Sequence, residues 1–194
     1  MGSASNINAK YPMRKVPVID TPHCAREESA LMPAESLKIR PAREADVQLL
    51  VEFIRGIAEY EKLLDEVEAT EEGVRQSLFG EKPAAEALIG EWDGEPVAFA
   101  VYFENFSTFM GRAGLYLEDL FVKPEYRNRG IGKLMLKHLA GIAVERGCPR
   151  LEWVALDWNE SAIEFYEGLG AHQMSDWRLF RMSGDSLEHL ATEE

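Results

Sequence analysis

Two strand-like runs on either side of Asp93-Gly94 restrict the fold of this chain more than any other feature. Residues 86–92 and 96–103 are rich in apolar side chains, and an Asp-Gly pair between two such runs is the strongest short-range signal for a β-hairpin. A third run, residues 115–122, ends at Lys123-Pro124 because proline cannot donate a hydrogen bond within a sheet. The middle of the chain is therefore predicted to form a sheet.

Helical periodicity surrounds this sheet. Apolar residues recur at spacings of three and four in residues 44–64 and 130–146, and Gly147 closes the second of these segments. The other predicted elements are helices from the N-cap Thr70 to residues 79–80 and over residues 159–169, and strands over residues 37–40, 150–156 and 177–182. Helices that alternate with strands of one sheet predict a mixed α/β fold, with one domain over residues 37–194.

Residues 1–36 differ from the rest of the chain. They contain four prolines and neither a helical nor a strand period, which predicts a mobile extension ahead of the folded domain. The extension holds four basic and four acidic residues, so the formal net charge of −13 arises entirely from residues 37–194. A field of that sign repels nucleic acid and attracts cations, although an acidic surface can also serve only to keep a protein soluble.

The sequence also limits the compartment and the inorganic cofactors. No run approaches the roughly 18 apolar residues of a membrane span, and the N-terminus lacks the layout of a secretory signal. Cys24 and Cys148 suggest neither a disulfide framework nor a metal site, and the four histidines lack ligand spacing. We therefore expect a cytoplasmic protein without a metal, a membrane or a nucleic-acid partner.

Residues 120–133 carry the clearest chemical signal. A strand of the buried type stops at Pro124, makes a short polar turn and enters a helix through Gly130 and Gly132. Such a turn directs backbone N–H groups and the positive end of a helix dipole toward one point, and glycine lets a pyrophosphate approach closely. The spacing fits neither a P-loop nor the dinucleotide fingerprint. A glycine-rich helix start without a ligand is the alternative.

The pattern Arg127-x-x-Gly130-x-Gly132 after a strand resembles the acetyl-CoA signature of the GNAT superfamily. Two further blocks follow the order of that superfamily: Leu-Asp-Trp-Asn at residues 156–159, and Phe-Tyr-Glu-Gly-Leu-Gly-Ala at residues 165–171. Upstream, Tyr-Leu-Glu-Asp-Leu-Phe-Val at residues 116–122 resembles a strand of the diamine (spermidine/spermine) and thialysine N-acetyltransferases, and Ala-Glu-Tyr-Glu at residues 58–61 resembles a segment of their first helix.

The resemblance runs from about residue 37 to the C-terminus. Residues 106–111 lack the acid and the tryptophan that the animal diamine enzymes have between two strands, and Leu-Asp-Trp-Asn is closer to the thialysine type. The implied fold is a mostly antiparallel sheet with a splay between two strands and flanking helices, and the implied assembly is a homodimer. The implied reaction transfers an acetyl group from acetyl-CoA to a primary amine of a diamine, a polyamine or a thialysine-like amino acid.

The resemblance also implies roles for individual residues. The amine site would contain Tyr60, Glu61 and Glu118, and Tyr166 would stand beside the cofactor sulfur. The cofactor would be held in three ways. The main chain of the strand would contribute Leu120, Phe121 and Val122, and the side-chain amide of Asn159 would add a hydrogen bond. The loop with its cationic side chains would contribute Arg127, Asn128, Arg129, Gly130, Ile131, Gly132 and Lys133.

The proposed chemistry requires a proton acceptor and a proton donor. An alkyl ammonium of pKa about 10.4 must lose a proton before it attacks a thioester, which costs ~4.6 kcal/mol at pH 7. Glu118 is the candidate acceptor, directly or through an ordered water, unless it is an ordinary solvent-facing residue. Strand alternation places Asp119 on the other face, where we expect a structural role. Tyr166 would return a proton to the thiolate, unless it is a core residue like Phe165.

Other functions remain open from the sequence. A protein or peptide acetyltransferase would need an open groove for an extended chain, and an acidic groove would suit a lysine tail. A non-catalytic sensor of acyl-CoA or polyamine is disfavoured because Glu118, Asn159 and Tyr166 are all present. Core packing is the expected role of Trp153 and Trp158.

Overall fold

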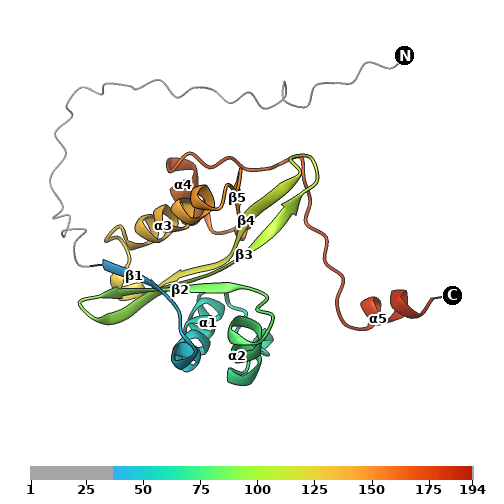
Figure 1. The fold of residues 1–194 in the computed structure, drawn as a ribbon, viewed down its shortest axis with the longest axis horizontal. Helices are drawn as coiled ribbons and strands as arrows, with labels where there is room; N and C mark the ends of the chain where they lie inside the picture. Colours follow the sequence, from blue (N-terminus) through green and yellow to red (C-terminus); the bar gives the residue numbers. More distant parts are fainter. Residues whose placement is uncertain (1–36, 194) are drawn as a thin grey trace, which may run out of the picture. The chain divides into compact units, whose positions relative to one another are not determined.

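A five-stranded sheet is built around the hairpin at Asp93-Gly94 (Figure 1). The computed structural model describes residues 37–193. The strands lie side by side in the sheet in the same order as in the sequence: β1 Leu37–Pro41, β2 Glu86–Trp92, β3 Glu95–Ser107, β4 Arg112–Val122 and β5 Leu151–Glu152. The first four strands pair in antiparallel fashion, whereas β5 runs parallel to β4. The predicted mixed α/β fold is confirmed.

The hairpin forms because both residues of its turn accept a left-handed backbone. Asp93 has φ 51° and Gly94 has φ 86°, as a two-residue turn of this hand requires. The ends of β2 agree with the predicted strand, while β3 continues four residues beyond the predicted end, to Ser107.

Helices cover both faces of the sheet. The covering helices are α1 Val47–Glu61, α2 Glu71–Phe79, α3 Ile131–Glu145 and α4 Glu160–Gly168, with short 3-10 turns at Glu44–Asp46, Leu64–Glu66 and Pro124–Tyr126. A further helix, α5 Asp185–Thr192, is exposed along its whole length. The side chain of Thr70 accepts a hydrogen bond from Gly73 N, which confirms the predicted N-cap of α2. Gly147, with φ 69°, follows α3 as predicted.

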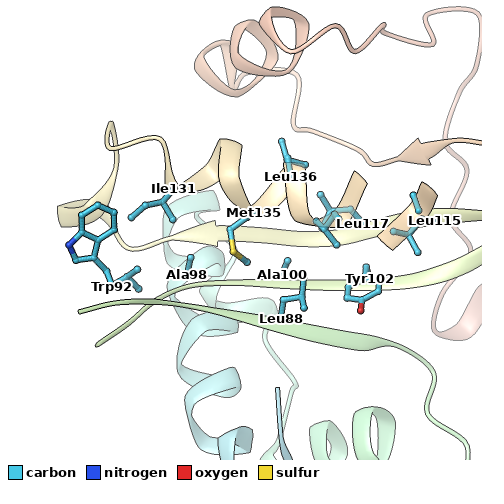
Figure 2. Packing of buried hydrophobic residues seen from close by; sticks show 13 residues of the cluster. Leu88, Trp92, Ala98, Ala100, Tyr102, Leu115, Leu117, Ile131, Met135 and Leu136 are labelled. Atoms are coloured by element: carbon cyan, nitrogen blue, oxygen red, sulfur yellow. The ribbon is translucent and has the colours of Figure 1, made fainter. Parts of the chain in front are cut away.

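The two faces have separate hydrophobic cores. Figure 1 shows α3 and α4 on one face and α1 and α2 on the other. Under α3, Ile131 and Met135 pack among the side chains of the strands, including Ala100 and Leu117 (Figure 2). On the opposite face Phe53 of α1 stacks on Phe99 of β3, with ring centroids 5.1 Å apart. This sandwich fixes β4 between α3 and α1.

The C-terminal part of the chain departs from the predictions. The strand predicted for residues 150–156 comprises only Leu151–Glu152, residues 177–182 form no strand, and α5 had no predicted counterpart. A strand needs a neighbour to accept its hydrogen bonds, and within residues 37–193 no sheet edge pairs with residues 177–182. The predicted extension, residues 1–36, lies outside the described residues. Between residues 37 and 193, no helix is long and apolar enough to cross a membrane.

Candidate functional site

The strands β4 and β5 separate soon after they meet. Leu115 pairs with Leu151 and Tyr116 pairs with Glu152, and β5 ends there. In the described part of the chain, β3 is therefore the only strand beside residues 117–122 of β4. This is the predicted splay, and the open edge includes the main chain of Leu120, Phe121 and Val122.

The loop after β4 forms a cradle of backbone N–H groups. Asn128 and Gly130 both have a left-handed backbone, with φ 60° and 79°. The hydrogen bond that closes the first turn of α3 runs from Leu134 N to Gly130 O, so the N–H groups of residues 131–133 lack partners within the helix. No described heavy atom beyond its chain neighbours comes within 4 Å of the place that a Cβ on Gly130 would take. The cradle thus fits a pyrophosphate.

Two arginines of this loop brace the surrounding structure. Arg127 Nε donates a hydrogen bond to Val122 O at 2.9 Å, and its guanidinium carbon lies 4.3 Å from the ring centroid of Tyr60. Arg129 donates to Glu125 O at 3.1 Å and lies over the ring of Tyr126. Arg127 therefore joins the end of β4 to the end of α1.

A glycine lets α1 lie close to β4. A Cβ at Gly56 would stand 3.0 Å from the ring of Phe121, which is tighter than ordinary van der Waals contact. Glycine is unfavourable inside a helix, so its presence here serves the close approach of the two elements. The approach brings Tyr60 and Glu61, at the C-terminal end of α1, toward the splay.

The helix α4 contributes Asn159 and Tyr166. Asn159 is the N-cap of α4, where its Oδ1 accepts hydrogen bonds from Ala162 N at 3.4 Å and from the hydroxyl of Tyr60 at 3.3 Å. The ring of Tyr166 packs 5.0 Å from that of Trp153. Burial raises the pKa of Tyr166, and the charge of Glu61 and the nearby Tyr60 raise it further, so the phenol is a proton donor at neutral pH.

A β-bulge reshapes the acidic part of β4. Val101 lies opposite Asp119 and Tyr102 lies opposite Leu117, which leaves Glu118 without a partner on β3. The bulge reverses the alternation, so Asp119 shares the α1 face with Phe121 whereas Leu117 packs under α3. The prediction for Asp119 rested on strict alternation, which would put Asp119 opposite Glu118 and on the face of Leu117; the bulge makes this placement wrong.

Asp119 belongs to the same charged cluster as two predicted site residues. Burial raises the pKa of its carboxyl to about 6, with smaller contributions from the negative charges of Glu118 and Glu61. Burial also raises the pKa of Glu61. In the sequence, the only sign that Asp119 belongs to the site was that it directly follows another acid, Glu118. The bulge itself could not be predicted, because it does not change the pattern of hydrophobic residues.

The tryptophans have different environments. Trp153 packs against the core beneath α3, as predicted. Trp158 is 50% exposed, its ring centroid is 6.2 Å from that of Tyr60, and Lys62 Nζ lies 6.0 Å from it. The prediction of core packing is wrong for Trp158, which instead borders the site. In the described part of the chain no group of three or more His, Cys, Asp or Glu side chains is placed to hold a metal ion.

Fold and site together define a protein with an N–H cradle for an anion beside a cluster of carboxylates and tyrosines. Residues 52–171 match the model of the Acetyltransferase (GNAT) family. The chain belongs to this family and is an acetyltransferase.

Several curated acetyltransferases are similar to most of this chain. A thialysine N-epsilon-acetyltransferase of Bos taurus is 41% identical over 164 residues, which cover 79% of this chain and 96% of the relative. The L-ornithine N5-acetyltransferase NATA1 of Arabidopsis thaliana is 30% identical, with 79% of this chain and 87% of the relative covered. Among solved structures, an integron cassette protein from V. cholerae has a TM-score of 0.69 at 29% identity and covers 81% of this chain and 99% of its own.

Proposed function

We propose that the chain transfers an acetyl group from acetyl-CoA to a primary amine of a small cationic substrate, such as a diamine, a polyamine or a thialysine-like amino acid. The observation that carries this proposal is that Tyr60 and Glu61 of α1 lie near enough to Tyr166 of α4 to raise its pKa, while Arg127 joins Tyr60 to the end of β4. Relatives named for thialysine and ornithine acetylation, at 41% and 30% identity, support the same substrate class.

The cofactor would be bound mainly by backbone groups. The open edge of β4 at residues 120–122 would hold the pantetheine arm, and the cradle at residues 128–133 would hold the pyrophosphate, with Lys133 adding positive charge. Asn159 would bind through its amide nitrogen, since its Oδ1 already accepts hydrogen bonds. Acetyl-CoA supplies the thioester from which the acetyl group is transferred.

The amine side of the site is anionic. Glu61 and Tyr60 would attract and orient the ammonium group, and Glu118 would take up its proton, directly or through an ordered water. Tyr166 would donate a proton to the departing thiolate, because its raised pKa keeps the phenol protonated. Backbone N–H groups of β4 near Leu120 would stabilise the oxyanion.

A survey of free amines tests the function. The protein is incubated with acetyl-CoA and each amine, and a thiol reagent records the release of CoA. We expect thialysine, ornithine and short diamines to react faster than lysine-containing peptides of equal amine concentration. Faster reaction of the peptides would favour protein acetylation, and no CoA release with any amine would contradict the proposal.

We also propose that two copies form a homodimer through the segment Trp177 to Met182, hereafter the C-terminal arm. Its apolar side chains are strongly exposed, with Trp177 at 67% and Phe180 at 88%. The arm has the composition of a strand but no strand partner among the described residues. A second copy of the chain would cover this apolar surface. We further expect a cytoplasmic protein, in keeping with the free Cys148.

Sedimentation of arm variants tests the dimer. Wild type is expected to sediment as a dimer, and the double variant Trp177→Ser with Phe180→Ser is expected to sediment as a monomer because the apolar surface is lost. Val144→Ser is the matched control, since Val144 is 77% exposed on α3 and lies outside the arm. A dimer that survives in the double variant would place the interface elsewhere.

A further inference from the structure

Asp119 is a half-buried carboxylate without a cationic partner among the described residues. Among residues 37–193 it forms no hydrogen bond or ion pair. The charges that act on it, Glu118 and Glu61, are both negative and both raise its pKa, which burial has already raised most. Burial of an unpaired carboxylate costs free energy, so this position indicates a role in function rather than in stability.

The bulge sets Asp119 between the interior and the solvent. Glu118, the residue without a partner on β3, is exposed, while Asp119 is half-buried on the face of α1. Across from the bulge, β3 offers the apolar Val101. The charged groups that act on Asp119 are Glu118 on β4 and Glu61 on α1. These two carboxylates act in turn on further groups of the site: Glu118 on Tyr116 of β4, and Glu61 on Tyr166 of α4. Tyr60 of α1 also acts on Tyr166, and Arg127 of the loop after β4 lies over the ring of Tyr60.

We propose, on the basis of the function proposed above, that the ammonium proton reaches Glu118 by way of Asp119, in place of the direct or water-mediated transfer: Asp119 is the first acceptor of the proton, and Asp119 passes it to Glu118. The two carboxylates are consecutive, interact electrostatically, and span the distance from the buried face to the surface. Glu118 then releases the proton to water. Asp119 thereby joins the reaction as a proton acceptor, and Glu118 serves as the exit.

The proton balance is complete with these groups. The ammonium gives one proton to Asp119, and the free amine forms a C–N bond with the thioester carbonyl. The C–S bond then breaks, and its electron pair stays on sulfur. Tyr166 protonates the thiolate and regains a proton from the new amide nitrogen, while the proton on Asp119 leaves through Glu118. One proton is released to water for each acetyl group transferred.

The titration of Asp119 suits this role. With a pKa of about 6 the group is ionised at neutral pH and is more basic than an ordinary carboxylate. The kcat/KM of wild type should therefore fall below about pH 6 and level off above it. This fall of kcat/KM at acidic pH reflects the coupled titration of the neighbouring carboxylates, and Asp119 contributes most to it.

The test compares the pH profiles of Asp119→Asn and Glu118→Gln with that of wild type. In Asp119→Asn we expect kcat/KM at pH 7 to fall about 100-fold, within the usual range of general base catalysis. It should then rise about tenfold per pH unit up to pH 9, because only free amine reacts. In Glu118→Gln we expect a smaller loss and an acid limb displaced to lower pH, because the charge that raises the pKa of Asp119 is gone.

Thermal stability separates a catalytic from a structural role. The raised pKa means that ionised Asp119 destabilises the folded state above pH 6, so Asp119→Asn should raise Tm at pH 8 by a few degrees, and the difference should vanish near pH 4. A lower Tm at both pH values would indicate a structural role and contradict the proposal. An acid limb that persists in Asp119→Asn and disappears in Glu118→Gln would make Glu118 the sole acceptor. If wild type acetylates no amine, the proposed function fails instead.

Discussion

Tyr166→Phe is expected to lower turnover by about 10²–10⁴-fold, the usual contribution of a general acid. The substitution keeps the ring, which packs against Trp153 and Phe165, and removes only the hydroxyl. Because the raised pKa of Tyr166 reflects burial and the neighbouring Glu61, the lost group is a phenol held in its protonated form. Steady-state kinetics with a reactive amine measure the effect, and the Kd for CoA should change little.

A second tyrosine serves as the matched control. Tyr102 is also buried, and burial beside Glu86 raises its pKa to about 12, but it lies among the core residues beneath α3. Tyr102→Phe removes a hydroxyl that donates to Glu86 and should cost some stability while leaving turnover near the wild-type value. Equal turnover in Tyr166→Phe and wild type would show that Tyr166 only packs in the core.

Local signals predicted those elements whose partners lie nearby in the sequence. Asp93-Gly94 predicted the hairpin, because the turn geometry depends on these two residues alone. Thr70 predicted the start of α2 in the same way. The prediction of a strand at residues 177–182 was wrong because a strand depends on a neighbouring strand, and the alternation of these residues does not reveal whether such a neighbour exists.

In the candidate site, too, the features formed by neighbouring residues were predictable, and those formed by distant residues were not. The cradle at residues 128–133 was predictable because strand, turn and helix start are contiguous in the chain. By contrast, the contact of Arg127 with Tyr60 joins residues 67 positions apart, and the hydrogen bond of Tyr60 with Asn159 joins residues 99 positions apart. The bulge at Glu118 arises from the pairing of β3 with β4, so the face of Asp119 could be known only from the structure.

Gly130→Asp is expected to abolish the stabilisation of the protein by CoA. A ligand at 100 times its Kd stabilises the folded state by about 2.7 kcal/mol, which corresponds to roughly 5–10 °C in Tm for a chain of this size. The new carboxylate would lie at the N-terminus of α3, where the N–H groups of residues 131–133 lack helical partners. It would occupy these donors and repel the pyrophosphate. Thermal melts with and without CoA measure the difference.

Gly147→Asp separates the loss of binding from backbone strain. Gly147 follows the other end of α3 with φ 69°, close to the 79° of Gly130, and neither position has a described heavy atom within 4 Å of an added Cβ apart from chain neighbours. The two variants therefore bear a similar conformational cost, of about 1 kcal/mol, but only Gly130→Asp places charge at the cradle. We expect Gly147→Asp to melt at a lower temperature and to keep the full shift with CoA. A full shift in Gly130→Asp as well would place the pyrophosphate away from this loop.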